Sequence, residues 1–432
     1  MTRTLSIVVA WMGVPLILAA QTPATPASCT QDVNVWYNGA IRSAQEAAKL
    51  PGATTPDYGA VFAGRTDRLK QCAAKFTVEA STGADLLALA ALYSQVGFDS
   101  LAMAAVNKRM RDPGLGEPER AAALVEMIRT LTKPDTVLIV RAEPYMRQLD
   151  AMSDAVILDK LAAHSALNSE YRYLDINDRI RQHSLAIIAL GRHIKSTPGM
   201  SSFELLEAYT NLAEVYADLG QIDSTFKVLD QARQDHPEIP ASDVDEFLGP
   251  ERQRYELVGQ PATELEAGHW LNAAAGTRSF SPRGKVTVIE FTAHWCIPCR
   301  NSYASMSAMA DSFAVRGVQF AFATEFYGYF GARKNLDVPA ELAADQEYYV
   351  GEHGIHFPVA IADRPPVPKP GERYVQEPNS GRYRVGGIPQ TVIIDRHGVI
   401  RRILTGWDPG NAQRMPVLLA ALLKDAPAAP SP

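Results

Sequence analysis

The stretch Val286-Thr-Val-Ile-Glu-Phe-Thr-Ala-His-Trp-Cys-Ile-Pro-Cys-Arg300 joins an apolar, β-branched run to two cysteines that are separated by two residues. The run Val286–Phe291 has the length and composition of a central strand covered on both faces. Beyond the cysteines, Arg300–Val315 predicts a helix, because its apolar side chains recur at spacings of three and four, at Tyr303, Met306, Met309, Ala310 and Phe313. The cysteines therefore stand where a buried strand gives way to a helix, and Pro298 is tolerated in the first turn of that helix.

The cysteine pair has the spacing of a redox site. At the start of a helix, Cys296 meets unpaired backbone N–H groups and the helix dipole, which favour the thiolate and make this sulfur a nucleophile. Thiol-disulfide exchange also needs a second thiol within one turn to resolve the mixed disulfide, and Cys299 provides it. We predict that the two form a redox-active disulfide.

Other uses of the pair are less consistent with the sequence. A structural zinc site needs a second Cys or His pair, but the remaining cysteines, Cys29 and Cys72, lie far upstream, and no histidines show paired spacing. Covalent haem attachment is excluded because Arg300, not histidine, follows Cys299. A peroxidase acting through a single sulfur is a further alternative.

Glu290 is the one acidic residue within the apolar run. Burial in a strand raises the pKa of a carboxyl group, so that it can hold or accept a proton near neutral pH. We predict that Glu290 accepts the proton of Cys299. The alternative is a strand-end glutamate that reaches solvent or pairs with a lysine such as Lys285.

Five blocks in order resemble the thioredoxin superfamily, and more closely its TlpA-like periplasmic branch. The resemblance extends from about Gly259 to Leu423, and its blocks are Gly259-Gln-Pro-Ala, Arg283-Gly-Lys-Val, Phe291–Arg300, Gly354–Asp363 and Tyr383–Gly398. It implies an α/β thioredoxin-like domain that catalyses thiol-disulfide exchange on protein substrates and draws electrons from an upstream donor. No cofactor is implied, because the cysteine pair carries the two electrons itself.

The resemblance also implies a substrate-binding edge. The proline corresponding to Pro389 is cis in that family, and the preceding residue, here Ile388, offers backbone groups to an extended substrate segment. Trp295, Ile297 and Pro298 are expected to contact substrate beside it. An ordinary trans turn proline is the alternative at Pro389.

The direction of exchange is open between a reductase and a disulfide-forming oxidase. Ile297 and Pro298 bring no charge or histidine that would strongly stabilise the thiolate, which favours the reductase. Two segments, Glu325–Tyr349 and the proline-rich Arg364–Arg382, are longer than a minimal thioredoxin needs. They either shape the choice of partner or are surface insertions.

The N-terminus predicts export. Met1-Thr-Arg3 is followed by the apolar stretch Leu5–Ala20, which is typical of a signal peptide over residues 1–20, with an uncleaved membrane anchor as the alternative. We expect a periplasmic protein with antioxidant activity. In an oxidising compartment Cys29 and Cys72 are candidates for a structural disulfide, and two buried, unpaired thiols are the alternative.

Residues 21–250 are rich in alanine and leucine and predict an all-α region. One stretch follows the large and small positions of a tetratricopeptide repeat, at Tyr209, Leu212, Ala213, Tyr216, Gly220, Thr225, Leu229, Ala232 and Pro237. A looser match occurs at Leu86, Leu89, Ala90, Tyr93, Gly97, Ala102 and Val106, and Leu158–Leu167 and Ile180–Ile194 are also predicted to be helical. Such a region binds a peptide or partner protein, or is a spacer; if binding is its main role, the chain is a scaffold with an auxiliary redox domain.

The 432 residues thus predict a multidomain protein with an all-α, repeat-like region over residues 21–250 and a thioredoxin-like domain over residues 255–425. Residues 426–432 are expected to be a disordered tail. A net charge of −6 without a basic cluster gives no electrostatic basis for binding nucleic acid.

Overall fold

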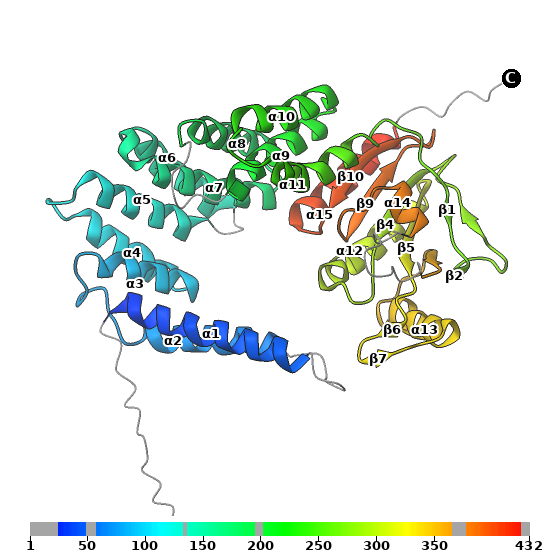
Figure 1. The fold of residues 1–432 in the computed structure, drawn as a ribbon, viewed down its shortest axis with the longest axis horizontal. Coiled ribbons are helices and arrows are strands. Elements are labelled where there is room, and N and C mark those ends of the chain that lie inside the picture. Colours follow the sequence, from blue (N-terminus) through cyan, green and yellow to red (C-terminus); the bar gives the residue numbers. More distant parts are fainter. Residues whose placement is uncertain (1–24, 49–57, 133–135, 195–201, 365–376, 425–432) are drawn as a thin grey trace, which may run out of the picture. The chain divides into compact units, whose positions relative to one another are not determined.

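The computed structural model describes residues 25–48, 58–132, 136–194, 202–364, 377–424 of the chain (Figure 1). The predicted signal peptide, the prolines at positions 365, 366, 368 and 370, and the predicted tail lie outside the described residues. Within them, no helix combines the length and apolar character that crossing a bilayer requires.

The described residues fall into two compact units, and the first ends at Arg109. This division lies inside the predicted region 21–250; the boundary predicted between residues 250 and 255 remains a prediction. The first unit is helical, with α1 (Pro26–Ala48), α2 (Tyr58–Ala73), α3 (Asp85–Gln95) and α4 (Asp99–Met110).

A disulfide joins Cys29 on α1 to Cys72 on α2, and their Cα atoms are 6.0 Å apart. Both cysteines are buried. The alternative of two unpaired thiols does not match this arrangement.

The second unit begins with helices, which are α5 (Glu117–Leu131), α6 (Thr136–Asp150), the 3-10 turn η1 (Asp154–Val156), α7 (Ile157–Tyr173), α8 (Asn177–Gly191), α9 (Ser202–Asp218), α10 (Ile222–Asp235) and α11 (Ala241–Tyr255). Successive helices from α7 to α11 pack against each other. Helix α8 ends at Gly191, three residues before the predicted end at Ile194.

The two patterned stretches each form a pair of successive helices. Tyr209, Leu212 and Ala213 on α9 are buried where that helix packs against α10. Gly97 and Gly220 stand in the turns within the two pairs, with φ of 82° and 72°. A side chain with a Cβ is strained in this left-handed region, which explains glycine there. The helical content is consistent with tetratricopeptide-like repeats, and that assignment remains a prediction.

The second unit ends in an α/β domain, which confirms the predicted fold class (Figure 1). Its elements are β1 (Leu265–Glu266), β2 (His269–Leu271), β3 (Ser279–Phe280), β4 (Val286–Phe291), α12 (Ile297–Ala314), β5 (Val318–Glu325), β6 (Tyr329–Phe330), β7 (Arg333–Lys334), α13 (Val338–Asp345), the π-helix η2 (Gln346–Glu352), β8 (Val359–Ala362), α14 (Pro378–Arg382), β9 (Gln390–Ile394), β10 (Ile400–Thr405) and α15 (Pro409–Leu422).

Six strands form the main sheet in the order β10-β9-β4-β5-β8-β2. β4 pairs in parallel with β5 and antiparallel with β9, so it lies in the middle of the sheet. All six of its residues are buried, as the apolar run predicted. A parallel pair needs a crossover connection, and α12 supplies it between β4 and β5.

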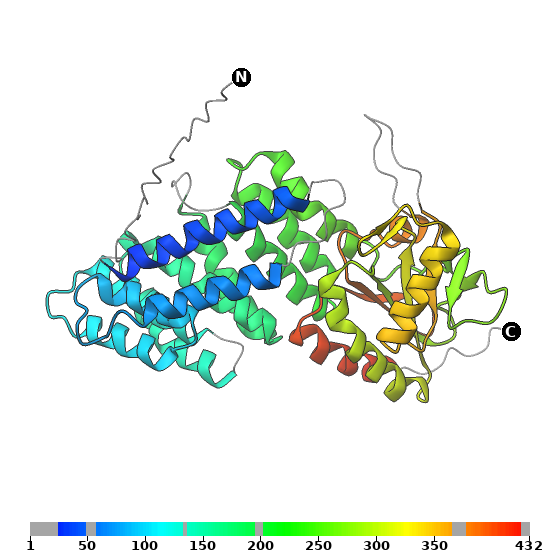
Figure 2. The same cartoon turned by 90° about the horizontal axis from the view of Figure 1, so that it is seen from below.

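The faces of β4 alternate because successive side chains point to opposite sides of a sheet. Val286 and Val288 belong to the core that also contains residues of α12 and α15, and these two helices lie side by side on one face of the sheet in Figures 1 and 2. Ile289 and Phe291 belong to the core on the opposite face. Glu290 shares the parity of Val286 and Val288, so its side chain points to the face that α12 covers.

Candidate active site

The cysteine pair lies at the junction of β4 and α12. Cys296 is the N-cap residue of α12, and its Sγ accepts the backbone N–H of Cys299 at 3.2 Å. A disulfide joins the two cysteines, whose Cα atoms are 5.3 Å apart. An N-cap sulfur faces the positive end of the helix dipole, so the same geometry would stabilise a thiolate on Cys296 once the bond is reduced.

The two sulfurs differ in access. Cys296 is 4% exposed and Cys299 is fully buried. Next to Cys296, the side chains of Trp295 and Ile297 are 48% and 65% exposed, and Pro298 is also exposed. A partner can therefore approach the pair from the side of Cys296.

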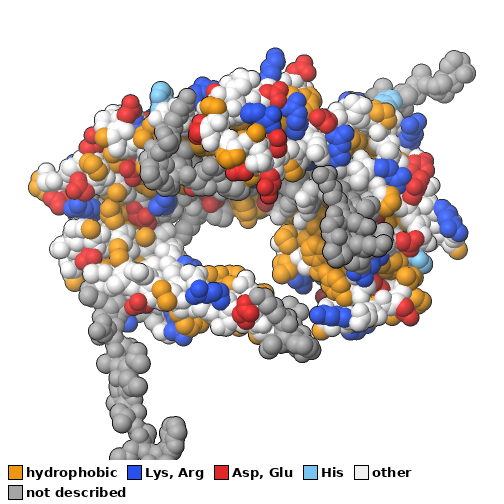
Figure 3. Space-filling model, viewed as in Figure 1, with side chains coloured by type: hydrophobic (Ala, Val, Ile, Leu, Met, Phe, Trp, Pro, Cys, Tyr) orange, Lys and Arg blue, Asp and Glu red, His pale blue; other side chains and the backbone are white. Residues whose placement is uncertain are grey.

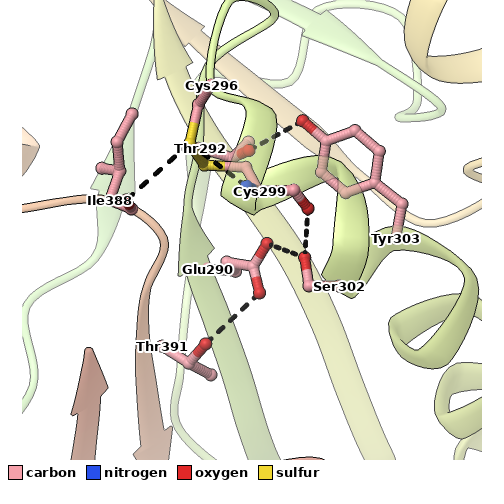
Figure 4. The surroundings of a disulfide bond; sticks show 8 residues. All are labelled: Glu290, Thr292, Cys296, Cys299, Ser302, Tyr303, Ile388 and Thr391. Carbon is pink, nitrogen blue, oxygen red and sulfur yellow. Dashed lines mark hydrogen bonds between the residues drawn. A yellow bond between two sulfur atoms is a disulfide. The ribbon is translucent and has the colours of Figure 1, made fainter. Parts of the chain in front are cut away.

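The loop before β9 lies against this sulfur. The peptide bond between Ile388 and Pro389 is cis, as the family resemblance implied, and the trans alternative is wrong. The carbonyl oxygen of Ile388 is 3.7 Å from Sγ of Cys296 (Figure 4). Ile388 is half-buried and Pro389 is buried. The structure thus brings the predicted substrate edge next to the cysteine that was predicted to be the nucleophile.

Glu290 lies beneath the first turns of α12 and is only 1% exposed. Its Oε1 accepts a hydrogen bond from Ser302 Oγ at 2.6 Å, and its Oε2 accepts one from Thr391 Oγ1 at 3.3 Å (Figure 4). Burial raises the pKa of this carboxyl to about 8, although both hydrogen bonds oppose the shift. The alternative of a solvent-reaching glutamate is therefore wrong, and Lys285 is exposed at the other end of β4.

Ser302 and Thr391 were not predicted as site residues. Ser302 Oγ also lies within hydrogen-bond distance of the carbonyl oxygen of Cys299, at 2.7 Å, which links Glu290 to the cysteine pair. A neighbouring polar contact joins Thr292 Oγ1 and the hydroxyl of Tyr303 at 2.8 Å. A serine three residues after Cys299 is on the same face of the helix, so helical periodicity was the available signal for it.

The first insertion builds an aromatic cluster beside Trp295. The ring of His294 is stacked on Phe330 with 4.4 Å between centroids, and Tyr327 and Tyr329 contact His294 edge-on. Trp295 meets Tyr327 edge-on with a centroid distance of 5.7 Å. Burial lowers the pKa of His294 to about 4, so this imidazole is neutral at neutral pH.

A buried carboxylate holds the aromatic loop. Glu341 on α13 is 1% exposed and accepts the backbone N–H groups of Tyr327 and Gly328 at 2.7 and 2.8 Å. The insertion therefore forms ordered walls next to the disulfide. Figure 3 shows hydrophobic side chains gathered on the visible face of the α/β domain around α12. The aromatic cluster was not predicted from the length of this insertion, and the signal for it in the sequence is the run Phe326-Tyr-Gly-Tyr-Phe330.

Within the part of the chain that the structure describes, no three His, Cys, Asp or Glu side chains come together in a way that could hold a metal ion. The groups that the structure places together at the site are the two sulfurs, one buried carboxyl and the hydroxyls around it.

No protein-family model matches the chain. It is similar to two proteins named thiol-disulfide oxidoreductase ResA, from Geobacillus thermodenitrificans and Geobacillus kaustophilus, each 26% identical over 124 residues. The similarity covers 29% of this chain and 56% of each relative, so the chain spans about half the length of the curated relatives it matches. A solved thiol-disulfide isomerase from Corynebacterium glutamicum is 24% identical, with 38% of this chain and 97% of that chain covered and a TM-score of 0.29.

Proposed function

We propose that the chain is an exported thiol-disulfide oxidoreductase that reduces disulfides of protein substrates. The observation that carries the proposal is the position of Cys296, at the N-terminus of α12 and 3.7 Å from the carbonyl oxygen of Ile388. The name of the two relatives, thiol-disulfide oxidoreductase, supports the same class of reaction. Export rests on the apolar N-terminal stretch, and the periplasm on the family resemblance.

The reaction begins with the reduced pair. The Cys296 thiolate attacks one sulfur of a substrate disulfide, which forms a mixed disulfide and releases the other substrate sulfur as a thiolate. Cys299 gives its proton to Glu290 and attacks Sγ of Cys296. The internal disulfide forms, and the second substrate thiolate leaves. The substrate gains two electrons, the cysteine pair loses two, and an upstream donor restores the pair.

The surroundings suit a protein substrate. The Ile388 carbonyl offers a hydrogen-bond acceptor to an extended segment, and the exposed side chains of Trp295 and Ile297 offer apolar contact area. The helical region of residues 21–250 is a candidate for binding a peptide or protein partner. The disulfide-forming oxidase, the peroxidase and the scaffold remain alternatives to a reductase.

Trapping of mixed disulfides tests the proposal. With Cys299→Ala, the resolving thiol is lost, so protein substrates should accumulate on Cys296 in an oxidised extract and be released by dithiothreitol. The matched variant Cys296→Ala should trap much less, because Cys299 is fully buried. Equal trapping by both variants, or trapping by neither, would contradict an exchange reaction that begins at Cys296.

The reduction potential of the Cys296–Cys299 pair then decides the direction. A reductase should equilibrate with glutathione at a potential near or below that of the thioredoxins, about −270 mV, and an oxidase far above it. A scaffold predicts that Cys296→Ser leaves the biological function intact, and a peroxidase predicts consumption of hydrogen peroxide by Cys299→Ala.

A further inference from the structure

Ser302 stands between the buried carboxyl and the cysteine pair. It lies one turn after Cys299 on α12 and is fully buried. Its Oγ is 2.6 Å from Oε1 of Glu290 and 2.7 Å from the carbonyl oxygen of Cys299. Both distances are those of short hydrogen bonds, and both partners are acceptors when Glu290 is ionised.

A serine hydroxyl has one proton, so it cannot donate a linear, full-strength hydrogen bond to two acceptors at once. When Glu290 is ionised, a proton directed at Cys299 leaves two oxygens 2.6 Å apart without a hydrogen between them. The hydroxyl must then donate to Glu290, and its bond to the Cys299 carbonyl is lost. When Glu290 is protonated, its own O–H can donate to Ser302, and the Ser302 proton is free to donate to Cys299.

We propose that Ser302 is a positioning residue that couples the protonation state of Glu290 to the first turn of α12, by turning its hydroxyl from the carboxylate to the Cys299 carbonyl. This inference rests on the proposed function. During resolution Glu290 takes the proton of Cys299, and the hydroxyl then turns from Glu290 to the Cys299 backbone. That rotation leaves the number of protons unchanged. Ser302 donates to Glu290 when the carboxyl is ionised and to the Cys299 carbonyl when it is protonated.

Few other polar groups around Glu290 could influence its protonation state. From β9 it meets the Thr391 hydroxyl at 3.3 Å, and from α12 it meets Ser302, whose Oγ is also next to the Cys299 carbonyl. Tyr303, also on α12, is the nearby titratable side chain, and its pKa lies far above the physiological range because of burial. Among the described residues, no charged side chain forms an ion pair with Glu290. The hydroxyl of Ser302 is thus its strongest polar contact.

The coupling predicts a shift in the pH profile. Ser302→Ala removes the shorter of two hydrogen bonds to the carboxylate, so the ionised form of Glu290 becomes harder to reach. The step that depends on Cys299 should move to higher pH by about one unit or more, given the usual size of a hydrogen bond to a charged group. Thr391→Val removes the longer bond and should give a smaller shift in the same direction.

A single-turnover assay isolates this step. The reduced full-length protein is mixed with the disulfide 5,5′-dithiobis(2-nitrobenzoate). Attack by Cys296 forms the mixed disulfide and releases one coloured thiolate, and release of the second coloured thiolate reports the attack by Cys299. Rates are measured from pH 5 to 10 in the wild type, Ser302→Ala, Ser302→Thr and Glu290→Gln. Ser302→Thr restores a hydroxyl and should return the profile toward the wild type. Ser312→Ala is the matched control, because Ser312 makes a similar bond to the Ala308 carbonyl on the exposed side of α12.

A second measurement follows the carboxyl directly. The infrared band of the protonated Glu290 carboxyl, identified by its absence in Glu290→Gln, should titrate at higher pH in Ser302→Ala than in the wild type. An unchanged band and an unchanged release profile in Ser302→Ala would overturn the coupling. Release of the second coloured thiolate by Cys299→Ala at the wild-type rate would instead overturn the proposed function. The two failures are therefore distinguishable.

Discussion

At the scale of single residues, ionisation of Glu290 costs free energy in the folded protein because its side chain is buried. Its ordinary pKa of 4.5 is raised to about 8 by burial. A raised carboxyl pKa contributes stability that is fully present below pH 4.5 and is lost as the pH rises through 8. Glutamine keeps the shape and removes the charge.

We therefore expect Glu290→Gln to gain stability relative to the wild type as the pH rises from 5 to 9. The gain should reach a few kcal/mol at most, on the scale of about 1.4 kcal/mol per pKa unit. Denaturant unfolding of the oxidised protein at several pH values measures it. Glu347→Gln, which removes an exposed charge, is the control. A Glu290→Gln difference that does not change with pH would show that this carboxyl ionises freely in the native state.

Glu290 was foreseeable, but its partners were only partly so. A single acid in an apolar strand is visible in the sequence, and the parity of β4 directs it toward α12. Ser302 is 12 residues away, and helical spacing from Cys299 could have identified it. Thr391 is 101 residues away on another strand, and the sequence does not show how that strand pairs with β4. Contacts of this second kind depend on strand pairing, which residue patterns do not report.

At the scale of elements, the aromatic loop depends on α13. Glu341 accepts hydrogen bonds from two backbone N–H groups of the half-buried residues Tyr327 and Gly328. Loss of both bonds to this charged acceptor costs about 1–2 kcal/mol for each group.

We expect Glu341→Ala to destabilise the domain by about 2–4 kcal/mol and to loosen Tyr327 and Trp295. Hydrogen exchange should rise in residues 326–330 before it rises in β4. The exposed Glu347→Ala on the neighbouring η2 is the control. If exchange in 326–330 stays at the level of that control, the loop is held by its aromatic contacts and not by the carboxylate.

The sequence predicted elements well where apolar residues form a continuous run or recur with helical spacing, and poorly elsewhere. The strand Val286–Phe291 has the predicted bounds, and α12 starts at Ile297 because the Cys296 N-cap begins it three residues before the predicted Arg300. The role of the insertion as a wall of the site was not predicted, although its aromatic run Phe326–Phe330 was a signal for it. Its two-residue strands and π-helix have no repeating pattern, and Glu341, which bonds its loop, lies 13 and 14 residues further along the chain.

At the scale of the whole molecule, charged residues join the helices of the second unit to its α/β domain. Arg414 on α15 pairs with Asp175 at 2.7 Å, Asp218 at 3.0 Å and Glu214 at 3.4 Å. Arg402 on β10 also pairs with Asp218. The partners are about 200 residues apart in the chain, so no local sequence pattern predicts these ion pairs. These contacts lie within one compact unit and predict that its helices and its sheet unfold together.

Arg414→Gln tests that coupling. Arg414 is only 14% exposed, and its removal leaves three carboxylates with less positive charge, so we expect a loss of about 3 kcal/mol in unfolding free energy. Burial raises the pKa of Asp175 to about 6, an effect that Arg414 opposes. The defect should therefore shrink as the pH falls to about 6 and below, where a protonated Asp175 no longer needs a cation. Arg401→Gln, which breaks a pair on a 47% exposed arginine, should cost less than about 1 kcal/mol. If Arg414→Gln unfolds like Arg401→Gln at pH 7, the charged cluster does not hold the two parts together; if it splits the transition in two, the cluster is what makes the unit cooperative.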